Sequence, residues 1–340
     1  MHCMNWNLIG HEWAVNLLHQ HIARGEVHHA YLFTGPPGIG RRTLALRFAQ
    51  AINCLQPPAP GQLCGKCRMC VQLERLQQSD LSLIQAGQEG GELKVDAIRQ
   101  LQHSLSLAPY EARYRIALLL RFQEANSNAQ NALLKTLEEA PDKVILLLTA
   151  DSAEVLKETI VSRCEVLRLR PLPLDIVRSS LEARGTPPEL ANLVAHISGG
   201  RPGYAIRLSQ DPKLLEKRLE WLDDLWEQFQ NNRRKRFAFA EGITKTKHGT
   251  REERDQMREN LRAMILTWIS FWRDVMLRSV GSSGALTNPD QIERVDRLAV
   301  DFDLSGARRQ VSALEDGLTR LNNANLQLLM DVLLLDLPRI

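Results

Sequence analysis

The feature that most constrains the fold is a series of short apolar segments in the first half of the chain. They are rich in β-forming residues or wholly apolar, and they read AYLFTG (30–35), LSLIQAG (81–87), RIALLL (115–120), VILLLTA (144–150) and EVLRLR (165–170). Longer stretches of helical spacing lie between them, such as the stripe formed by Leu44, Phe48 and Ile52. Strands that are apolar on both faces and separated by helices indicate a parallel sheet in an α/β domain.

The pattern changes near Pro171 and Pro173, which have the character of a hinge. Short helical segments broken by GTPPEL and SGGRPG follow, and beyond residue 211 almost everything has helical period apart from the loop VGSSGALTNPDQ. A chain of 340 residues is too long for one ordinary core. We therefore expect an α/β domain at 1–170, a small helical lid domain at 171–210 and an all-α C-terminal domain at 211–340.

Composition excludes several classes of protein. The chain is 44% hydrophobic and 24% charged with a formal net charge of +3, which is typical of a globular protein and only mildly basic. It has no apolar run long enough for a membrane span, and its first residues lack the profile of a signal peptide. We expect a cytoplasmic protein without membrane partners.

A glycine-rich turn follows the first apolar run and opens a helix, in the sequence YLFTGPPGIGRRTLALRFAQ (31–50). Gly35, Gly38 and Gly40 match the outline of a phosphate-binding loop, whose backbone N–H groups and helix N-terminus favour an anion. Arg41 stands where this loop has lysine, and Arg42 stands where it has the hydroxyl that ligates Mg²⁺. Thr43 comes one residue late, about 100° further round the helix.

The second half of a nucleotide site should be a strand that ends in acidic residues. The corresponding strand ends instead in Leu120 and Arg121, and Glu124 lies too far along to be an easy replacement. With two independent defects, we interpret the loop as a structural turn in a degenerate site. Weak nucleotide binding is the alternative, and hydrolysis is the least favoured.

Cysteines form the strongest chemical signal. Of six in the chain, Cys54, Cys64, Cys67 and Cys70 have the spacing C-x9-C-x2-C-x2-C, in a stretch rich in proline and glycine. Four thiolates at this spacing suit a closed structural zinc site, which predicts a zinc module at 54–70. A redox pair, uncoordinated thiols and an iron–sulfur cluster are the alternatives.

Two further segments, 128–141 and 162–164, lie on either side of the apolar run 144–150. NAQNALLKTLEEAP (128–141) has one apolar stripe and predicts a helix against the sheet, with Lys135 and Glu139 as an i,i+4 ion pair. Ser162, Arg163 and Cys164 directly precede the last strand. Arg163 is either a solvated side chain or a finger that reaches a phosphate on a neighbouring subunit, and the spacing does not choose between these.

The order of these motifs resembles that of the bacterial clamp-loader subunits of the AAA+ class. The resemblance extends from residue 7 to about 208 and rests on GHEWAVNLLHQHIARGEVHHAYLFTGPPGIG, the four cysteines, NALLKTLEEAP, SRC and GGRPGYAIRL. It implies an AAA+ (RecA-like P-loop) domain, zinc on the cysteines, and C-terminal helices that join a collar shared by the ring. It also implies that Arg163 completes the ATP site of a neighbouring motor subunit, and it makes Arg201 the lid arginine.

The hydrolysing members of this family keep the lysine and the acidic pair, so the chain looks like the non-hydrolysing type. The resemblance implies a subunit that is no enzyme on its own but belongs to the DNA polymerase III holoenzyme and helps load the sliding clamp onto primed DNA. Its implied partners are the motor (tau/gamma) and delta subunits. An active motor or another AAA+ replication or repair adaptor is the alternative. The basic stretch 231–254 either touches DNA or, as we favour, is a solvated helix face.

Overall fold

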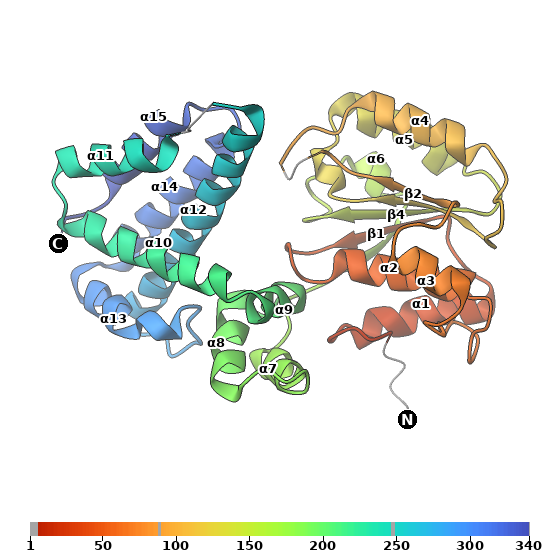
Figure 1. The fold of residues 1–340 in the computed structure, drawn as a ribbon, viewed down its shortest axis with the longest axis horizontal. Helices are drawn as coiled ribbons and strands as arrows, with labels where there is room; N and C mark the ends of the chain where they lie inside the picture. Colours follow the sequence, from red (N-terminus) through yellow and green to blue (C-terminus); the bar gives the residue numbers. More distant parts are fainter. Residues whose placement is uncertain (1–5, 88–89, 246–248, 340) are drawn as a thin grey trace. The chain divides into compact units, whose positions relative to one another are not determined.

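The structure is a computed structural model that describes residues 6–87, 90–245 and 249–339. Its chain divides into two compact units. The first, called the α/β unit, comprises Met1–Ser180 and Gly200–Ala205, and the second, called the helical unit, comprises Leu181–Gly199 and Ile206–Ile340. Figure 1 gives the labels of the helices and strands used below.

The α/β unit is built on a five-stranded parallel sheet, which confirms the prediction from the apolar runs. The strands lie in the order β2-β3-β4-β1-β5, and every pairing is parallel. The bounds are β1 Ala30–Thr34, β2 Leu81–Ile84, β3 Arg115–Leu119, β4 Val144–Ala150 and β5 Glu165–Arg168. The two central strands β4 and β1 are buried along their whole length, as expected for strands covered by helices on both faces.

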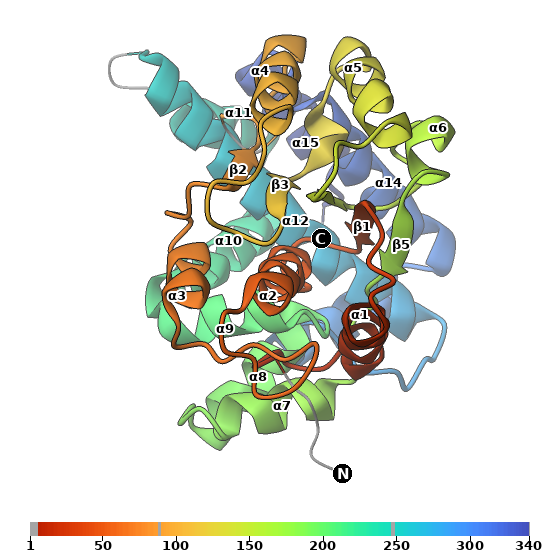
Figure 2. The same ribbon diagram turned by 90° about the vertical axis from the view of Figure 1, so that its right-hand side faces the viewer.

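Helices cover both faces of the sheet. Figures 1 and 2 show α1 (Glu12–Arg24), α2 (Arg41–Asn53) and α3 (Arg68–Glu74) on one face, and α4 (Val95–Leu105), α5 (Ser127–Glu138) and α6 (Glu158–Val161) on the other. Because side chains alternate along a strand, Tyr31 and Phe33 pack under the first set and Leu32 under the second. Each face therefore has its own apolar core.

The topology brings three strand ends together. Thr34 of β1 pairs with Ala150 of β4, and Leu119 of β3 pairs with Leu148 of β4. Since the strands are parallel, the loops that follow β1, β4 and β3 all leave the sheet at the carboxyl ends of the strands, which together form one edge of the sheet. The glycine loop and the residues after β3 and β4 meet at this edge, which is where ligands bind in open α/β sheets.

The helical unit consists of helices around an apolar core that includes large aromatic residues, so the predicted helical character of the C-terminal region is confirmed. Trp268, Trp272 and Phe271 of α12 are buried there with Phe229 of α10. From residue 211 on, its helices are α10 Pro212–Gln230, α11 Arg233–Thr244, α12 Arg251–Ser279, the short 3-10 helix η2 Pro289–Gln291, α13 Ile292–Asp301, α14 Leu304–Arg320 and α15 Leu326–Asp336. No helix in the described part of the chain has the length and apolarity needed to cross a membrane.

The predicted lid region forms three short helices, α7 (Leu174–Glu182), α8 (Pro188–Ser198) and α9 (Pro202–Gln210). They do not stand apart as a compact unit, because parts of α7 and α9 and the turn before α9 cluster with the sheet. The division into domains at 1–170, 171–210 and 211–340 stays a prediction.

Candidate functional site

The glycine loop lies between β1 and α2, as its sequence predicts. Gly35, Gly38 and Gly40 have φ angles of 142°, 82° and 110°, a region that favours glycine. A Cβ at Gly35 would lie 2.5 Å from the carbonyl oxygen of Leu169. Glycine is required here by backbone angles and by the close approach of a neighbouring chain segment.

Arg41, the first residue of α2, is turned toward the end of β4. Its Nη1 lies 2.8 Å from Oδ1 of Asp151, and the side chain of Arg41 is only 9% exposed while that of Asp151 is 46% exposed. The backbone N–H of Gly35 also donates to the carbonyl of Asp151, at 3.1 Å. Arg42 and Thr43 are exposed. The guanidinium of Arg41 is thus bound to a carboxylate of its own α/β unit.

The turn before α9 and the first turn of that helix pack directly on the loop. The backbone N–H groups of Gly203 and Tyr204 donate to the carbonyl oxygen of Gly38, at 2.8 and 3.2 Å. A Cβ at Gly38 would lie 2.8 Å from Cβ of Tyr204. The guanidinium carbon of Arg201 lies 4.7 Å from the centre of the Tyr204 ring. Arg201 therefore contacts an aromatic ring beside the loop.

The end of β3 has a cation where a nucleotide site would have carboxylates. Arg121 adopts a left-handed conformation with φ 49°, and its backbone N–H donates to Oγ1 of Thr149 at 2.9 Å. Its Nε donates to Oε1 of Glu124 at 2.9 Å, and the same oxygen accepts the N–H of Gly90 at 2.7 Å. The carboxylate of Glu124, three residues further along, is thus bound to Arg121 and to backbone.

Arg163 lies at the surface just after α6. Its Nη1 donates to the carbonyl of Thr159 at 2.8 Å, and its Nη2 donates to Oε1 of Glu138 at 2.7 Å. The side chain of Arg163 is 35% exposed and that of Glu138 is 51% exposed. Arg163 is therefore neither buried nor freely solvated, since a carboxylate at the end of α5 holds it.

The predicted ion pair between Lys135 and Glu139 is wrong. Helix α5 ends at Glu138, and Glu139 has φ −125° and ψ 67°, which is not helical. The backbone N–H of Glu139 still donates to the carbonyl of Lys135 at 3.0 Å, but within the described chain no ion pair joins the two side chains.

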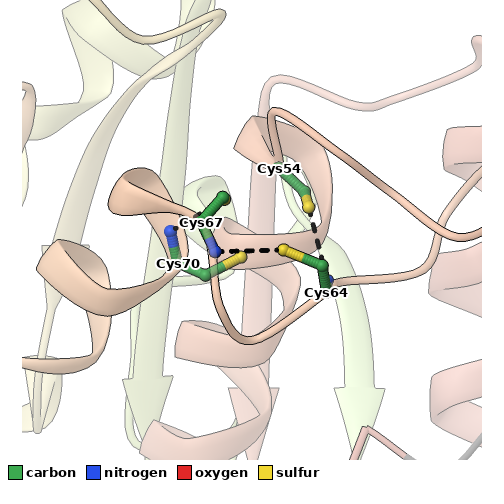
Figure 3. A group of neighbouring side chains, drawn as sticks. All are labelled: Cys54, Cys64, Cys67 and Cys70. Carbon is green, nitrogen blue, oxygen red and sulfur yellow. Dashed lines mark hydrogen bonds between the residues drawn. The ribbon is translucent and has the colours of Figure 1, made fainter.

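The four cysteines converge, as their spacing predicts. Their sulfur atoms all lie within 4.8 Å of one another, and Figure 3 shows them around one point between the end of α2 and the start of α3. Cys64 Sγ accepts the N–H of Cys67 at 3.2 Å, and Cys54 Sγ accepts the N–H of Cys64 at 3.3 Å. A tetrahedral zinc–thiolate site has sulfur atoms about 3.8 Å apart, so the donor set fits a metal ion.

Electrostatics differ among the four thiols. Backbone N–H groups of Cys67 and Lys66 lower the pKa of Cys64 to about 6, whereas burial raises the pKa of Cys54 and of Cys70. A bound cation would stabilise the thiolate form of all four. Cys3, the first cysteine of the chain, lies outside the described residues.

This cysteine module is fixed to the helices beneath the sheet. Gln50, which is 1% exposed, donates from Nε2 to the carbonyl of Cys70 at 2.7 Å. Trp6 donates from its indole N–H to the carbonyl of Gly61 at 3.3 Å. Arg47 on α2 forms an ion pair with Glu74 on α3. These contacts hold the module against α2 and favour a structural role.

One residue of the basic stretch is structural. Arg236 is 3% exposed, and its guanidinium donates to the backbone carbonyls of Gln228, Leu334, Leu337 and Pro338. The interpretation of this stretch as a solvated face is therefore wrong for Arg236. Residues 246–248 of the stretch lie outside the described residues.

Sequence reasoning missed the two acids that hold the arginines. Asp151 follows β4, and only the pairing of that strand with β1 brings it to Arg41. Glu138 lies in the motif NALLKTLEEAP, but its distance along the chain from Arg163 gives no sign of a contact. The parallel order of the strands was the one available signal, since it predicts neighbouring loops without giving their contacts.

A glycine loop between the first strand of a parallel sheet and the next helix, with further residues from the neighbouring strand ends, defines the P-loop class to which the AAA+ domains belong. The sequence also matches two family profiles. These are "DNA polymerase III, delta subunit" over residues 10–173 and "DNA polymerase III, delta subunit, C terminal" over residues 212–338. The chain therefore belongs to the DNA polymerase III delta-subunit family, and among its members it resembles the delta-prime subunits.

Individual relatives agree. The chain is 28% identical over 324 residues to DNA polymerase III subunit delta' of Bacillus subtilis, covering 94% of each chain. It is 35% identical over 199 residues to subunit delta' of Pseudomonas aeruginosa, covering 58% of this chain and 60% of that protein. It is 33% identical over 176 residues to subunit tau of Escherichia coli, covering 52% of this chain and 27% of tau.

Among solved structures, the chain is similar to a DNA polymerase III gamma-subunit-related protein of Thermotoga maritima. The TM-score is 0.48 at 16% identity, with 95% of this chain and 97% of that chain covered.

Proposed function

We propose that this chain is the delta-prime subunit of a DNA polymerase III clamp-loader complex and that it does not hydrolyse ATP itself. In this proposal it helps motor subunits load the sliding clamp onto primed DNA, and Arg163 completes the ATP site of a neighbouring motor subunit. The likeness to the delta-prime subunit of Bacillus subtilis over 94% of the chain supports the assignment as a delta-prime subunit. The arrangement of charges at the strand ends supports the proposal that the chain does not hydrolyse ATP.

The observation that carries the proposal is the pair of arginines at the edge of the sheet. Mg²⁺ with its nucleotide needs oxygen ligands and a lysine that reaches the phosphates. Here Arg41 is bound to Asp151, and Arg121 occupies the end of β3 with Glu124 bound to it. Hydrolysis would require both arginines to give up these contacts, because Asp151 and Glu124, the carboxylates described at these strand ends, are bound to them.

The proposed finger supports the same division of roles. Arg163 lies on the surface of the α/β unit, and its side chain is exposed enough to meet a partner. An arginine supplied to a phosphoryl-transfer site from a neighbouring subunit is worth about 10³ to 10⁵ in rate. The proposed partners are the motor (tau/gamma) and delta subunits, with the C-terminal helices as the shared collar.

We also propose that Cys54, Cys64, Cys67 and Cys70 hold a structural zinc ion. All four ligand positions would be occupied by protein, so the ion would stabilise the module and take no part in hydrolysis. The purified chain is expected to contain about one zinc per molecule, and Cys64→Ser should lower both the zinc content and the melting temperature. Zinc measured by emission spectroscopy checks this, and full zinc content in the Cys64→Ser variant would contradict it. Cys164→Ser is the matched control.

The experiment that tests the proposed function compares two preparations. The isolated chain should show no ATP turnover, while a ring assembled from motor subunits, the delta subunit and this chain should hydrolyse ATP when clamp and primed DNA are added. Turnover by the isolated chain that is lost on substituting Arg41 would instead favour an active motor. A ring that is equally active without this chain would also contradict the proposal.

A further inference from the structure

We propose that Glu138 is a positioning residue for Arg163, and that it orients the guanidinium before a partner subunit docks. This inference rests on the proposed function of Arg163 in a clamp-loader ring. It adds a residue that the resemblance to clamp-loader subunits does not supply, because it comes from a contact between α5 and the turn after α6.

The guanidinium is fixed at two points. Its Nη1 donates to the backbone carbonyl of Thr159 on α6, and its Nη2 donates to the carboxylate of Glu138, at 2.8 and 2.7 Å. Two anchors, together with the covalent bond to the rest of the side chain, fix the plane of the guanidinium as well as its position. The remaining N–H groups of the fork are then available for the oxygens of a phosphate.

Glu138 stands on a rigid base. It is the last residue of α5, whose Leu133 and Leu137 are buried in the core against the sheet. A packed helix end moves little, so a carboxylate there can hold a longer side chain in place. The turn that carries Arg163 is short, and the N–H of Arg163 donates to the carbonyl of Ile160 at 3.2 Å.

The position of Glu138 also has an electrostatic consequence. The C-terminal end of a helix carries partial negative charge, which disfavours a carboxylate there and favours a cation. Arg163 supplies that cation for Glu138. The neighbouring Glu139 is exposed too, but it forms no ion pair within the described chain, so the contact with Arg163 belongs to Glu138 alone.

The chemical benefit is that orientation is established before the reaction. A finger that samples many rotamers must lose that freedom in the transition state, whereas one held by two anchors has lost it already. Because the pair is partly exposed, the gain is modest. Exposed ion pairs are worth the equivalent of about 1.4- to 5-fold in rate.

Glu138→Ala in a reconstituted ring of motor subunits, delta and this chain tests the inference. We expect kcat for ATP hydrolysis, stimulated by clamp and primed DNA, to fall about 1.4- to 5-fold while KM for ATP stays unchanged. Glu138→Gln keeps an acceptor oxygen and should recover part of the loss. Glu139→Ala is the matched control, with the same change of charge one residue away and wild-type kcat expected.

The double variant Glu138→Ala/Arg163→Ala separates positioning from a general structural effect. If Glu138 acts through Arg163, the double variant has the same kcat as Arg163→Ala. Additive losses, or equal losses from Glu138→Ala and Glu139→Ala, would overturn the inference. Wild-type kcat for Glu138→Ala would overturn it as well.

The same data distinguish failure of the inference from failure of the proposed function. Wild-type hydrolysis in the Arg163→Ala ring would remove the finger and the inference with it. A large loss for Arg163→Ala with no loss for Glu138→Ala would remove the inference alone. Melting temperature and ring assembly of each variant, measured beforehand, show that the comparison is made between folded chains.

Discussion

The glycine loop and the turn that carries Arg163 each contain an arginine bound to a carboxylate of the same domain, yet they differ in depth. Arg41 is 9% exposed and its partner Asp151 comes from a neighbouring strand end. Arg163 is 35% exposed and its partner Glu138 comes from a helix end at the surface. The first pair joins the start of α2 to the residue after β4, whereas the second leaves its arginine accessible.

This difference shows that residue type alone does not decide what an arginine does. A deeply placed guanidinium that gives up its partner leaves an unsatisfied group behind, so it is held in place. A half-exposed guanidinium can exchange its carboxylate for a phosphate at little cost. Arg236 in the helical unit extends the series, since it is almost fully buried and binds backbone carbonyls.

The largest expected effect is on the accessible arginine. Arg163→Ala should slow hydrolysis at the neighbouring ATP site by about 10³- to 10⁵-fold without changing the stability of this chain. Single-turnover hydrolysis by the reconstituted ring measures it. Arg42→Ala, which removes an exposed arginine from the first turn of α2, is the control and should have no effect. An unchanged rate for Arg163→Ala would mean that the turn with Arg163, like the glycine loop, takes no part in hydrolysis.

The second effect concerns the deepest arginine. Arg236→Ala should lower the free energy of unfolding by about 3 kcal/mol, because buried carbonyls at the end of α15 would lose their donors. Denaturant titration of the full chain measures this value. Arg234→Ala, two residues earlier on an exposed position of α11, should change it by less than about 0.5 kcal/mol. Equal effects of the two substitutions would contradict the proposed role of depth.

A smaller effect is expected at the glycine loop. Arg41→Ala should lower the free energy of unfolding by about 1 to 2 kcal/mol, less than for a fully buried pair because Asp151 is half exposed. Hydrolysis by the assembled ring should stay at the wild-type rate. A loss of hydrolysis without a loss of stability would mean that the loop takes part in nucleotide chemistry. Thermal unfolding together with the ring assay gives both values.

The smallest effect concerns Asp80, a carboxylate that binds neither Arg41 nor Arg163. Burial alone would raise the pKa of Asp80, but N–H groups of Glu111, Tyr110 and Ala112 outweigh it and lower that pKa from 3.8 to about 2. The resulting stability is present above the unfolded pKa and is lost as the pH falls through about 2.

This stability amounts to roughly 2 kcal/mol in full, of which about 1 kcal/mol is lost between pH 6 and 3. Denaturant titrations between pH 6 and 3 should therefore show a decline that is weaker in Asp80→Asn. An identical decline in both chains would contradict this assignment.

Much of the fold was predictable from the sequence. Each apolar run contains one strand, and the three inner strands β1, β3 and β4 are almost fully buried, which requires apolar side chains on both faces. The convergence of the four cysteines was predictable as well, since close spacing leaves few other ways for such a segment to fold. The end of α5 was not predicted, because the identity of the last helical residue depends on local backbone angles rather than on the apolar stripe.

The sequence by itself determined the parallel sheet, the glycine turn, the helical C-terminal region and the cysteine cluster, because each is encoded by neighbouring residues. Only the tertiary structure decided which carboxylate meets which arginine. Asp151 reaches Arg41 through strand pairing, and Glu138 reaches Arg163 through the packing of α5 against the sheet. Such contacts join residues far apart in the chain, and their depth is set by the elements that cover them.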